Sequence, residues 1–174
     1  MIETNNVLLV NEQDKPIGEM EKLAAHEQGH LHRAFSVFIF NEEDELLLQQ
    51  RADEKYHGAG LWTNTCCSHP QMNEIVLESA KKRLQFEMGI DCDLQWVYSF
   101  IYKEKVENNL IEHEFDHVFK GYSNEKPMPN LNEVKDYKWM SISDIFSDMA
   151  NNPKQYTVWF KKALPELVKR MGKL

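Results

Sequence analysis

The sequence predicts one domain of mixed α/β class (α+β) over residues 1–174. Its length is sufficient for one full hydrophobic core, and no repeat, low-complexity segment or obvious linker divides the chain. Strand patterns that pair as hairpins occur beside helix patterns, and this order argues against a doubly wound parallel sheet.

Hairpin patterns dominate the first half of the chain. Residues 7–20 predict a hairpin whose turn contains the DKP at 14–16. The run AFSVFIF at 34–40 predicts a buried strand, and the polar turn NEEDE connects it to a partner strand, LLLQQR, at 46–51. Residues 52–71 are rich in Gly, His, Asn and Cys and have no clean period, which predicts a long functional loop.

The second half combines helices with long strands. The helix pattern at 72–89 ends at Gly89, a natural C-terminal stop, and carries an apolar stripe at four-residue spacing formed by Val76, Ala80, Leu84 and Met88. The other predicted elements are strands at 94–105 and 110–122 and helices at 141–150 and 153–171.

The composition is that of a globular protein, with 42% hydrophobic and 28% charged residues. The formal net charge is -8 and the lysines and arginines are spread out, so we expect no nucleic-acid partner. The N-terminal MIETNNVLLV lacks a secretory signal pattern, and no apolar run approaches about eighteen residues. We therefore expect a cytoplasmic monomer with no membrane partner.

The segment WTNTCCSHP holds two of the three cysteines, Cys66 and Cys67; the third is Cys92. An odd number without an export signal argues against a disulfide framework, and a bridge between neighbours would be badly strained. Cys67 and His69 project to the same side of an extended segment. Such a pair is typical of zinc ligation, a thiolate nucleophile or a proton-transfer cysteine. Because Cys92 lies in a different segment of the sequence, a catalytic cysteine is favoured over a zinc site built from several cysteines.

The predicted strand at 110–122 places Glu112 and Glu114 on one face. Two carboxylates at this spacing can offer oxygens to a divalent ion, although a solvated face is the more frequent explanation for a lone pair of glutamates. His113 and His117 fall on the opposite, apolar face, where satisfied core or edge histidines are the simpler interpretation.

Other candidate ligands have spacings that are not specific. On the predicted helix, Arg83 and Glu87 are four residues apart, which alone would indicate a weak surface ion pair. The candidate histidines are His26, His32 and His69, with His30 and His57 as competitors. Composition and spacing alone therefore indicate no more than a divalent-metal enzyme.

Six segments occur in an order that resembles the type I isopentenyl diphosphate isomerases, which belong to the Nudix superfamily. They are EKLAAH, LHRAFSVFIF, WTNTCCSHP, KKRLQFEMG, IEHEF and YTVWF. The resemblance covers residues 5–174, and its most specific part is the WTNTCCSHP loop together with the E-x-E strand. It implies the Nudix fold, in which a mixed β-sheet is sandwiched between helices.

The signature of Nudix hydrolases is G-x5-E-x7-R-E-U-x-E-E-x-G-U, where U is aliphatic. Aligning its last glycine with Gly89 retains Glu74 and Glu87 as two of its glutamates. Four positions differ, since Ser68 replaces the first glycine, Lys82 the arginine, and Arg83 and Phe86 two glutamates. Hydrolases use that glutamate cluster to hold the ions that activate water on a diphosphate, so the hydrolytic centre is expected to be dismantled.

The resemblance also implies two metal sites and a substrate site. One divalent ion, zinc, manganese or magnesium, is expected in a roughly octahedral site of three histidines and two glutamates, formed by His26, His32, His69, Glu112 and Glu114. Glu87 is expected to bind a second ion, Mg²⁺, together with the diphosphate of an isoprenoid substrate. The residues expected around the substrate are Lys22, Arg51, Lys55, Arg83, Tyr102 and Trp159.

The implied reaction interconverts isopentenyl diphosphate and dimethylallyl diphosphate in isoprenoid biosynthesis, by metal-dependent protonation and deprotonation. Cys67 and Glu114 are the implied proton-transfer groups, and Cys66 is expected to point away from the site. Tyr102 could relay a proton, and Trp159 offers a π face to the transient cation. Towards dimethylallyl diphosphate, the resemblance implies that Glu114 protonates and Cys67 deprotonates, an order that the residues themselves leave open.

Two alternatives come from other functional classes. A Nudix diphosphate hydrolase predicts an intact glutamate cluster, which Arg83 and Phe86 interrupt. A non-catalytic diphosphate-binding Nudix module predicts the loss of Cys67 or Glu114, and both are present. The isomerase therefore agrees with the residue pattern better than either alternative.

Overall fold

The computed structural model of the protein describes residues 5–173. The predicted domain also includes residues 1–4 and 174, which lie outside the described part. Within residues 5–173 the strands form one nine-stranded mixed sheet. Its strands are β1 (Asn6–Val10), β2 (Pro16–Glu21), β3 (His32–Phe40), β4 (Leu46–Arg51), β5 (Trp62–Thr63), β6 (Cys66–Ser68), β7 (Leu94–Lys105), β8 (Ile111–Tyr122) and β9 (Val134–Met140).

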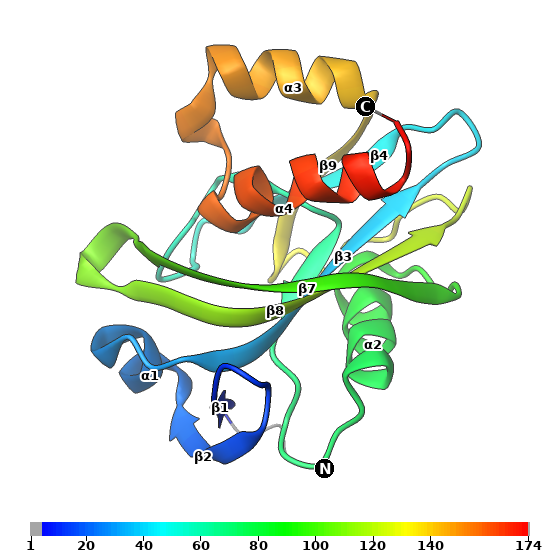
Figure 1. Cartoon of the computed structure of the whole chain (residues 1–174). Helices are drawn as coiled ribbons and strands as arrows, with labels where there is room; N and C mark the ends of the chain where they lie inside the picture. Colours follow the sequence, from blue (N-terminus) through cyan, green and yellow to red (C-terminus); the bar gives the residue numbers. More distant parts are fainter. Residues whose placement is uncertain (1–4, 174) are drawn as a thin grey trace.

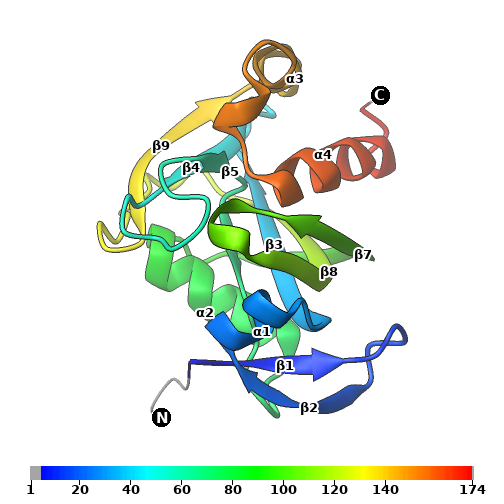
Figure 2. The ribbon, with the colours of Figure 1, turned by 90° about the vertical axis from the view of Figure 1, so that its left-hand side faces the viewer.

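Helices cover both faces of this sheet, as Figures 1 and 2 show. The helix α2 (Val76–Met88) lies on one side, and α3 (Ile142–Asn151) and α4 (Val158–Arg170) lie on the other. A short helix, α1 (Lys22–Gln28), connects the β1–β2 hairpin to β3. The mixed sheet between helices agrees with the fold class that the sequence predicts.

The central strand β3 contributes to two hydrophobic cores because its side chains alternate between the faces of the sheet. Phe35, Val37 and Ile39 pack with α2 on one face. Phe38 and Phe40 pack with α3 and α4 on the other face. Burial on both sides explains why this strand is a continuous apolar run.

Strand pairing brings three distant segments together at one end of β3. Parallel pairing with β8 sets His32 opposite Glu114, and antiparallel pairing with β6 sets Ser36 opposite Cys67. The antiparallel partner of β8 is β7, which places Tyr102 opposite Glu114. The ladder therefore fixes the relative positions of the candidate cysteine, a glutamate and a histidine.

Several predicted bounds are corrected by the structure. The predicted helix at 72–89 begins only at Val76, because residues 71–74 form a turn in which Glu74 accepts hydrogen bonds from the Gln71 amide and the Ser79 hydroxyl. The predicted loop at 52–71 contains β5 and β6, and the helix predicted at 153–171 is a short 3₁₀ turn followed by α4. Helix α1 and strand β9 are not among the elements that the sequence predicts.

The face of β8 that carries the acidic residues is the buried face, contrary to the simpler interpretation of a solvated pair. Glu112, Glu114 and Asp116 are buried, whereas His113 and His117 are only partly buried. Burial of three carboxyl groups side by side is costly unless they have polar or cationic partners. The polar pattern of this strand therefore indicates a site.

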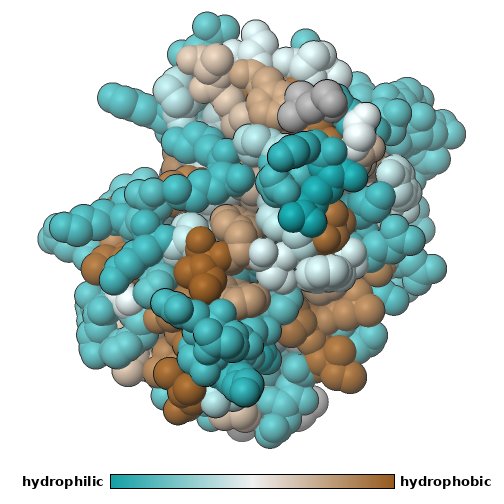
Figure 3. Space-filling model, in the orientation of Figure 1, coloured by the Kyte–Doolittle hydropathy of each residue, from teal (hydrophilic) through white to brown (hydrophobic). Residues whose placement is uncertain are grey.

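The outer surface carries its exposed large hydrophobic residues on several elements, including β2, α2, β7 and the segment before β9. On the face in Figure 3, hydrophobic groups alternate with predominantly hydrophilic residues. Scattered apolar residues are normal for a protein surface. They therefore identify no further functional region on this face.

The end of α2 provides a stability prediction. Gly89 has φ +67°, and a Cβ atom there would lie 2.9 Å from Cβ and 3.0 Å from the carbonyl oxygen of Met128. We expect Gly89→Ala to reduce the free energy of unfolding by about 1–3 kcal/mol, measured by urea denaturation. The matched control is Gly172→Ala, with φ +69° and no atom within 4 Å of the new Cβ. Equal losses in both variants would contradict a role for the Met128 contact.

Candidate active site and metal centre

A polar cavity opens where β4, β6, β8, α2 and α4 meet. Its walls include ten residues of the predicted site: Lys22, Arg51, Lys55, Cys67, His69, Arg83, Glu87, Glu112, Glu114 and Trp159. Three other predicted residues, His26, His32 and Tyr102, are buried beside this cavity and contact its carboxylates. The structure therefore brings all the predicted site residues into one region.

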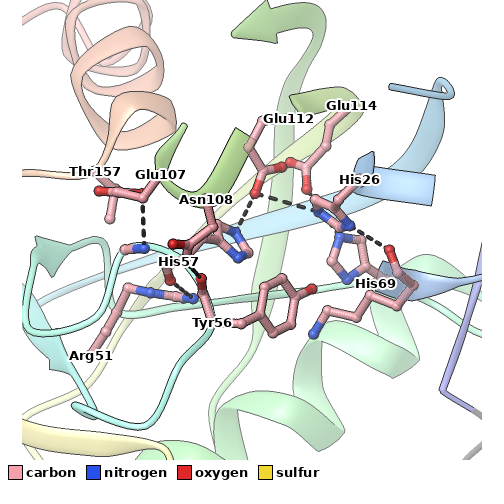
Figure 4. Close-up of polar contacts among 12 residues, drawn as sticks. His26, Arg51, Tyr56, His57, His69, Glu107, Asn108, Glu112, Glu114 and Thr157 are labelled. Atoms are coloured by element: carbon pink, nitrogen blue, oxygen red, sulfur yellow. Dashed lines mark hydrogen bonds and ion pairs between the residues drawn. The ribbon is translucent and has the colours of Figure 1, made fainter. Parts of the chain in front are cut away.

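A cluster of metal-ligand atoms lies at one end of the cavity (Figure 4). One ligand atom from each of His26, His32, His69 and Glu114 lies within 4.8 Å of the others. These residues come from α1, β3, the segment after β6, and β8. Glu112 contacts the same cluster, because its Oε1 lies 3.4 Å from Nε2 of His26.

Two of the histidines are oriented by backbone carbonyl groups. Nδ1 of His26 donates to the carbonyl oxygen of Lys22 at 2.6 Å, and Nδ1 of His32 donates to that of His30 at 2.8 Å. A carbonyl can only accept, so Nδ1 of each ring carries a proton and Nε2 is the nitrogen directed at the carboxylates. Metal-binding histidines usually have this second hydrogen bond.

Buried atoms without partners support a metal site. Among the described residues, Nε2 of His26, Nε2 of His32 and Oε2 of Glu112 are buried without a hydrogen-bond partner. Nε2 of His32 faces Oε1 of Glu114 at 3.6 Å, which is too long for a hydrogen bond. Imidazole nitrogens and carboxylate oxygens that face one another in this way fit a divalent ion.

The protonation states also suit a cation. Burial alone would raise the pKa of Glu112, but the imidazoles of His26 and His57 hold this pKa well below its usual range. The imidazoles of His32 and His69 likewise lower the pKa of Glu114 against burial and the adjacent Glu112. Burial lowers the pKa of His69 to about 4, so its imidazole is neutral near pH 7. The two ionised carboxylates beside the neutral imidazole of His69 place negative charge in the cluster, and a divalent cation would neutralise it.

Glu114 also belongs to a proton-bearing network. The hydroxyl of Tyr102 donates to its Oε2 at 2.7 Å, and Nε2 of His69 lies 3.0 Å from its Oε1. Burial and the nearby Glu114 raise the pKa of Tyr102 well above its usual value, so the phenol keeps its proton. Tyr102 therefore directs its hydroxyl proton at a carboxylate oxygen of the cluster.

Cys67 faces the cavity from β6, while its neighbour Cys66 is fully buried in the opposite core with α2. This confirms the prediction that the two thiols point apart, and both are free. Cys67 remains partly exposed within the cavity. The loss of solvent around the thiol raises its pKa to about 12, so Cys67 carries a proton near neutral pH.

Four cationic side chains, Lys22, Arg51, Lys55 and Arg83, also line the cavity. Burial, followed by the positive charges of Lys55, Arg51 and Arg83, lowers the pKa of Lys22. Cations that depress one another's pKa indicate a region prepared for an anion, and a diphosphate would supply that charge.

Arg83 and Glu87 form a buried ion pair, not the surface pair that spacing alone would indicate. Nε of Arg83 lies 2.7 Å from Oε1 of Glu87, whose exposed fraction is 4%. The amide of Gln49 donates to Oε2 of Glu87 at 2.8 Å. Arg83 also contacts Glu133 at 2.9 Å, and Lys55 pairs with the same carboxylate. Sequence reasoning did not identify Gln49 or Glu133.

An aromatic wall completes the cavity. The guanidinium of Arg51 lies 5.2 Å from the ring centre of Trp159, and this contact fixes the indole beside the cations. Tyr56 and His57 approach from the loop between β4 and β5. The sequence offered no signal for Tyr56, and it named His57 only as a competitor.

The hydrolase signature is altered in space as well as in sequence. Phe86 is half-exposed on α2, and Arg83 neutralises the retained Glu87. Glu74 hydrogen-bonds the turn before α2 and does not line the main cavity. The carboxylates that a hydrolase would gather along this helix are therefore separated or paired.

Comparison with known families identifies a NUDIX domain over residues 30–160. A protein from Photorhabdus laumondii, named isopentenyl-diphosphate Delta-isomerase 2, is 51% identical over 91% of this chain and 89% of its own length. An isopentenyl-diphosphate Delta-isomerase from Pectobacterium atrosepticum is 50% identical over 89% of this chain and 87% of its own length.

Two solved structures share the fold at low sequence identity. DR0079 from Deinococcus radiodurans superposes with a TM-score of 0.69 at 18% identity, covering 84% of this chain and 90% of that protein. A MutT protein from Methanosarcina mazei gives a TM-score of 0.67 at 18% identity, with 83% and 96% covered. These similarities confirm the predicted Nudix fold. Among the described residues, no helix is both long and apolar enough to span a bilayer.

Proposed function

The chain belongs to the isopentenyl-diphosphate Delta-isomerases of the Nudix superfamily, and we propose that it catalyses this isomerisation with the metal cluster, Cys67 and Glu114. The single observation that carries the assignment of residues is their convergence on one cavity. Cys67, Glu114 and the cationic residues all line it. The chain is thus an enzyme, and its substrate class is an isoprenoid diphosphate.

We assign one divalent ion, manganese, zinc or magnesium, to His26, His32, His69, Glu112 and Glu114. The support is the set of oriented imidazoles and ionised carboxylates that face one another. When bound, such an ion supplies positive charge that makes an adjacent carboxyl group more acidic. We assign a second ion, Mg²⁺, to Glu87 together with the substrate diphosphate, and this assignment requires the diphosphate to replace Glu87 as the partner of Arg83.

The substrate diphosphate is assigned to the cationic end of the cavity, where Lys22, Arg51, Lys55 and Arg83 converge. Binding energy from this remote group would hold the alkene beside the proton-transfer residues. The indole of Trp159 would face the transient tertiary cation, an interaction of about 2 kcal/mol or more when desolvated. This division separates the residues that bind from the residues that react.

Proton transfer is assigned to two groups in the cavity. An unactivated alkene is a very weak base, so its protonation requires a well-positioned acid. The Tyr102–Glu114 pair holds a proton at one position, and Cys67 holds the other. For each turnover one group gives a proton to the alkene and the other removes a proton from the neighbouring carbon.

The order of proton transfers implied by the resemblance requires Cys67 to act as a base. Towards dimethylallyl diphosphate, the Glu114 group would protonate the alkene and Cys67 would remove the second proton. Burial raises the pKa of Cys67 to about 12 and the pKa of Glu114 is lowered, so this order requires the thiol proton to move to the Glu114 carboxylate first. The turnover then leaves the thiol protonated and Glu114 ionised again. Arg51 is the neighbour whose charge opposes that rise in pKa.

The continuous sheet between the two cores supports a single domain for residues 1–174. A cytoplasmic monomer without nucleic-acid or membrane partners remains our prediction. The net charge of -8 supports the expected absence of a nucleic-acid partner. Gel filtration with light scattering would test the monomer.

The metal-dependent mechanism predicts a deuterated product. Mn²⁺-loaded protein and isopentenyl diphosphate are incubated in D₂O, and the product is followed by NMR. We expect dimethylallyl diphosphate that carries deuterium, no product after chelation, and recovery when Mn²⁺ is restored. Phosphate release is measured in parallel as the control for hydrolysis.

Each contrary result has a distinct meaning. Phosphate release without isomerisation would favour the hydrolase. Isomerisation by protein shown to be metal-free by elemental analysis would contradict the metal assignment. Neither activity in folded, metal-loaded protein would favour a binding module.

A further inference from the structure

His57 is a fourth histidine of the centre, outside the set of ligands proposed above. Its exposed fraction is 6%, and its Nε2 makes a direct contact with Oε1 of Glu112. Figure 4 shows the ring of His57 pointing from the loop between β4 and β5 towards this carboxylate. Ligand atoms of His26, His57 and Glu112 all lie within 4.8 Å of one another.

The contact with Glu112 differs from those of the histidines assigned to the ion. Nε2 of His26 faces Oε1 of Glu112 at 3.4 Å and forms no hydrogen bond with it. Nε2 of His57 is in direct hydrogen-bonding contact with the same oxygen, which leaves no room for an ion between them. Nδ1 of His57 has no hydrogen-bond partner among the described residues, so the acceptor on Glu112 places the ring proton on Nε2.

The two metal-site carboxylates are therefore held in parallel ways. Tyr102 donates to Oε2 of Glu114, and His57 donates to Oε1 of Glu112. Oε2 of Glu112 has no hydrogen-bond partner among residues 5–173. A donor on one carboxylate oxygen restricts rotation of the group and keeps the second oxygen available.

The loop holds His57 in place through contacts on both sides. The guanidinium of Arg51 donates to the carbonyl oxygen of His57 at 3.1 Å, and the amide of Asn108 donates to that of Tyr56 at 2.7 Å. The amide of Gly58 donates to Glu107 at 3.3 Å. The bonds with Asn108 and Glu107 fasten the loop to the turn that precedes β8, and β8 carries Glu112.

Aromatic packing fixes the plane of the imidazole. The ring centre of His57 lies 4.7 Å from that of Tyr56 and 5.9 Å from that of Trp159. The backbone, the ring plane and the Nε2 atom of His57 are thus all constrained. Such a side chain is suited to orient another group.

We propose that His57 is a positioning residue that donates a hydrogen bond from Nε2 to Glu112 and fixes this carboxylate for metal binding. The inference rests on the proposed function, because it assumes that Glu112 binds the ion. Partners of this kind typically contribute about 10–100-fold to metal affinity.

The test compares Mn²⁺ affinity among three variants by chelator competition. We expect His57→Leu, which removes the donor, to weaken binding about 10–100-fold. His57→Gln retains an N–H group at a similar reach, and we expect its affinity to stay within about threefold of the parent protein, well below the loss expected for His57→Leu. His30→Leu removes an exposed histidine outside the cavity and is the matched control.

A second readout separates positioning from direct chemistry. Isomerisation by His57→Leu should recover at saturating Mn²⁺, because the defect lies in metal binding. Unchanged Mn²⁺ affinity in folded His57→Leu would overturn the proposal. Equal losses of Mn²⁺ affinity in His57→Leu and His57→Gln, together with a changed visible spectrum of the Co²⁺-substituted variants, would also overturn the proposal. They would indicate that His57 binds the ion directly. A parent protein that binds no Mn²⁺ would instead remove the proposed metal site itself.

Discussion

Cys67→Ala is expected to lower kcat for isomerisation by about 10²–10⁴-fold, the usual contribution of a group that transfers a proton in the transition state. The thiol lines the cavity together with Glu114, and no other described cysteine does so. The measurement is deuterium incorporation into dimethylallyl diphosphate by NMR, at saturating Mn²⁺ and substrate.

The matched control for this loss is Cys92→Ala. Cys92 lies in the segment between α2 and β7 and does not line the cavity, so its thiol should be dispensable for activity. Activity in Cys67→Ala close to that of the parent protein would contradict the assignment of the thiol. Equal losses in both variants would indicate a general effect of cysteine substitution.

Arg83→Met is expected to reduce the free energy of unfolding by about 3 kcal/mol, measured by urea denaturation without substrate. Arg83 compensates the carboxylates of Glu87 and Glu133, and both are largely removed from water. Removing one partner leaves buried negative charge without its counterion. Breaking a buried ion pair typically costs about 3–5 kcal/mol, and because the Arg83 side chain is 19% exposed we expect a loss at the lower end of that range.

Arg170→Met provides a control with the same spacing on a helix. Arg170 pairs with Glu166 four residues earlier, but the two side chains are 48% and 39% exposed. A surface pair of this kind contributes about 0–1 kcal/mol. If Arg83→Met and Arg170→Met lost the same stability, burial of the Glu87 pair would have no energetic importance.

The sequence predicted the long strands of the site better than its loop. The two-residue period places Glu112 and Glu114 on one face whatever the surroundings, and the structure retains that face. Its burial was not predictable from this strand, because the groups that cover it, such as His26 and His57, come from distant segments. Residue types alone favoured a solvated pair.

Short elements and loops were the other parts of the fold that the sequence could not predict. The seven residues of α1 provide barely two helical turns, too few to show a clear period, although Glu21 accepts a hydrogen bond from the Ala24 amide at its start. The chemical pattern around Cys67 pointed to the candidate site even though the segment was predicted as a loop and is a strand. His57 lies in a loop without periodicity, so its partner could be found only in three dimensions.

The parallel pairing of β3 and β8 has a consequence for how quickly the chain folds. The hydrogen bond from Ser36 to Asp116 joins residues that are 80 positions apart, and His32 and Glu114 meet in the same ladder. Closing so long a loop is entropically unfavourable, and pairings of this kind form slowly. Because His32 and Glu114 are separated until the ladder closes, an ion at the proposed metal site should not accelerate the early steps of folding, and its stabilising effect should appear mainly as slower unfolding.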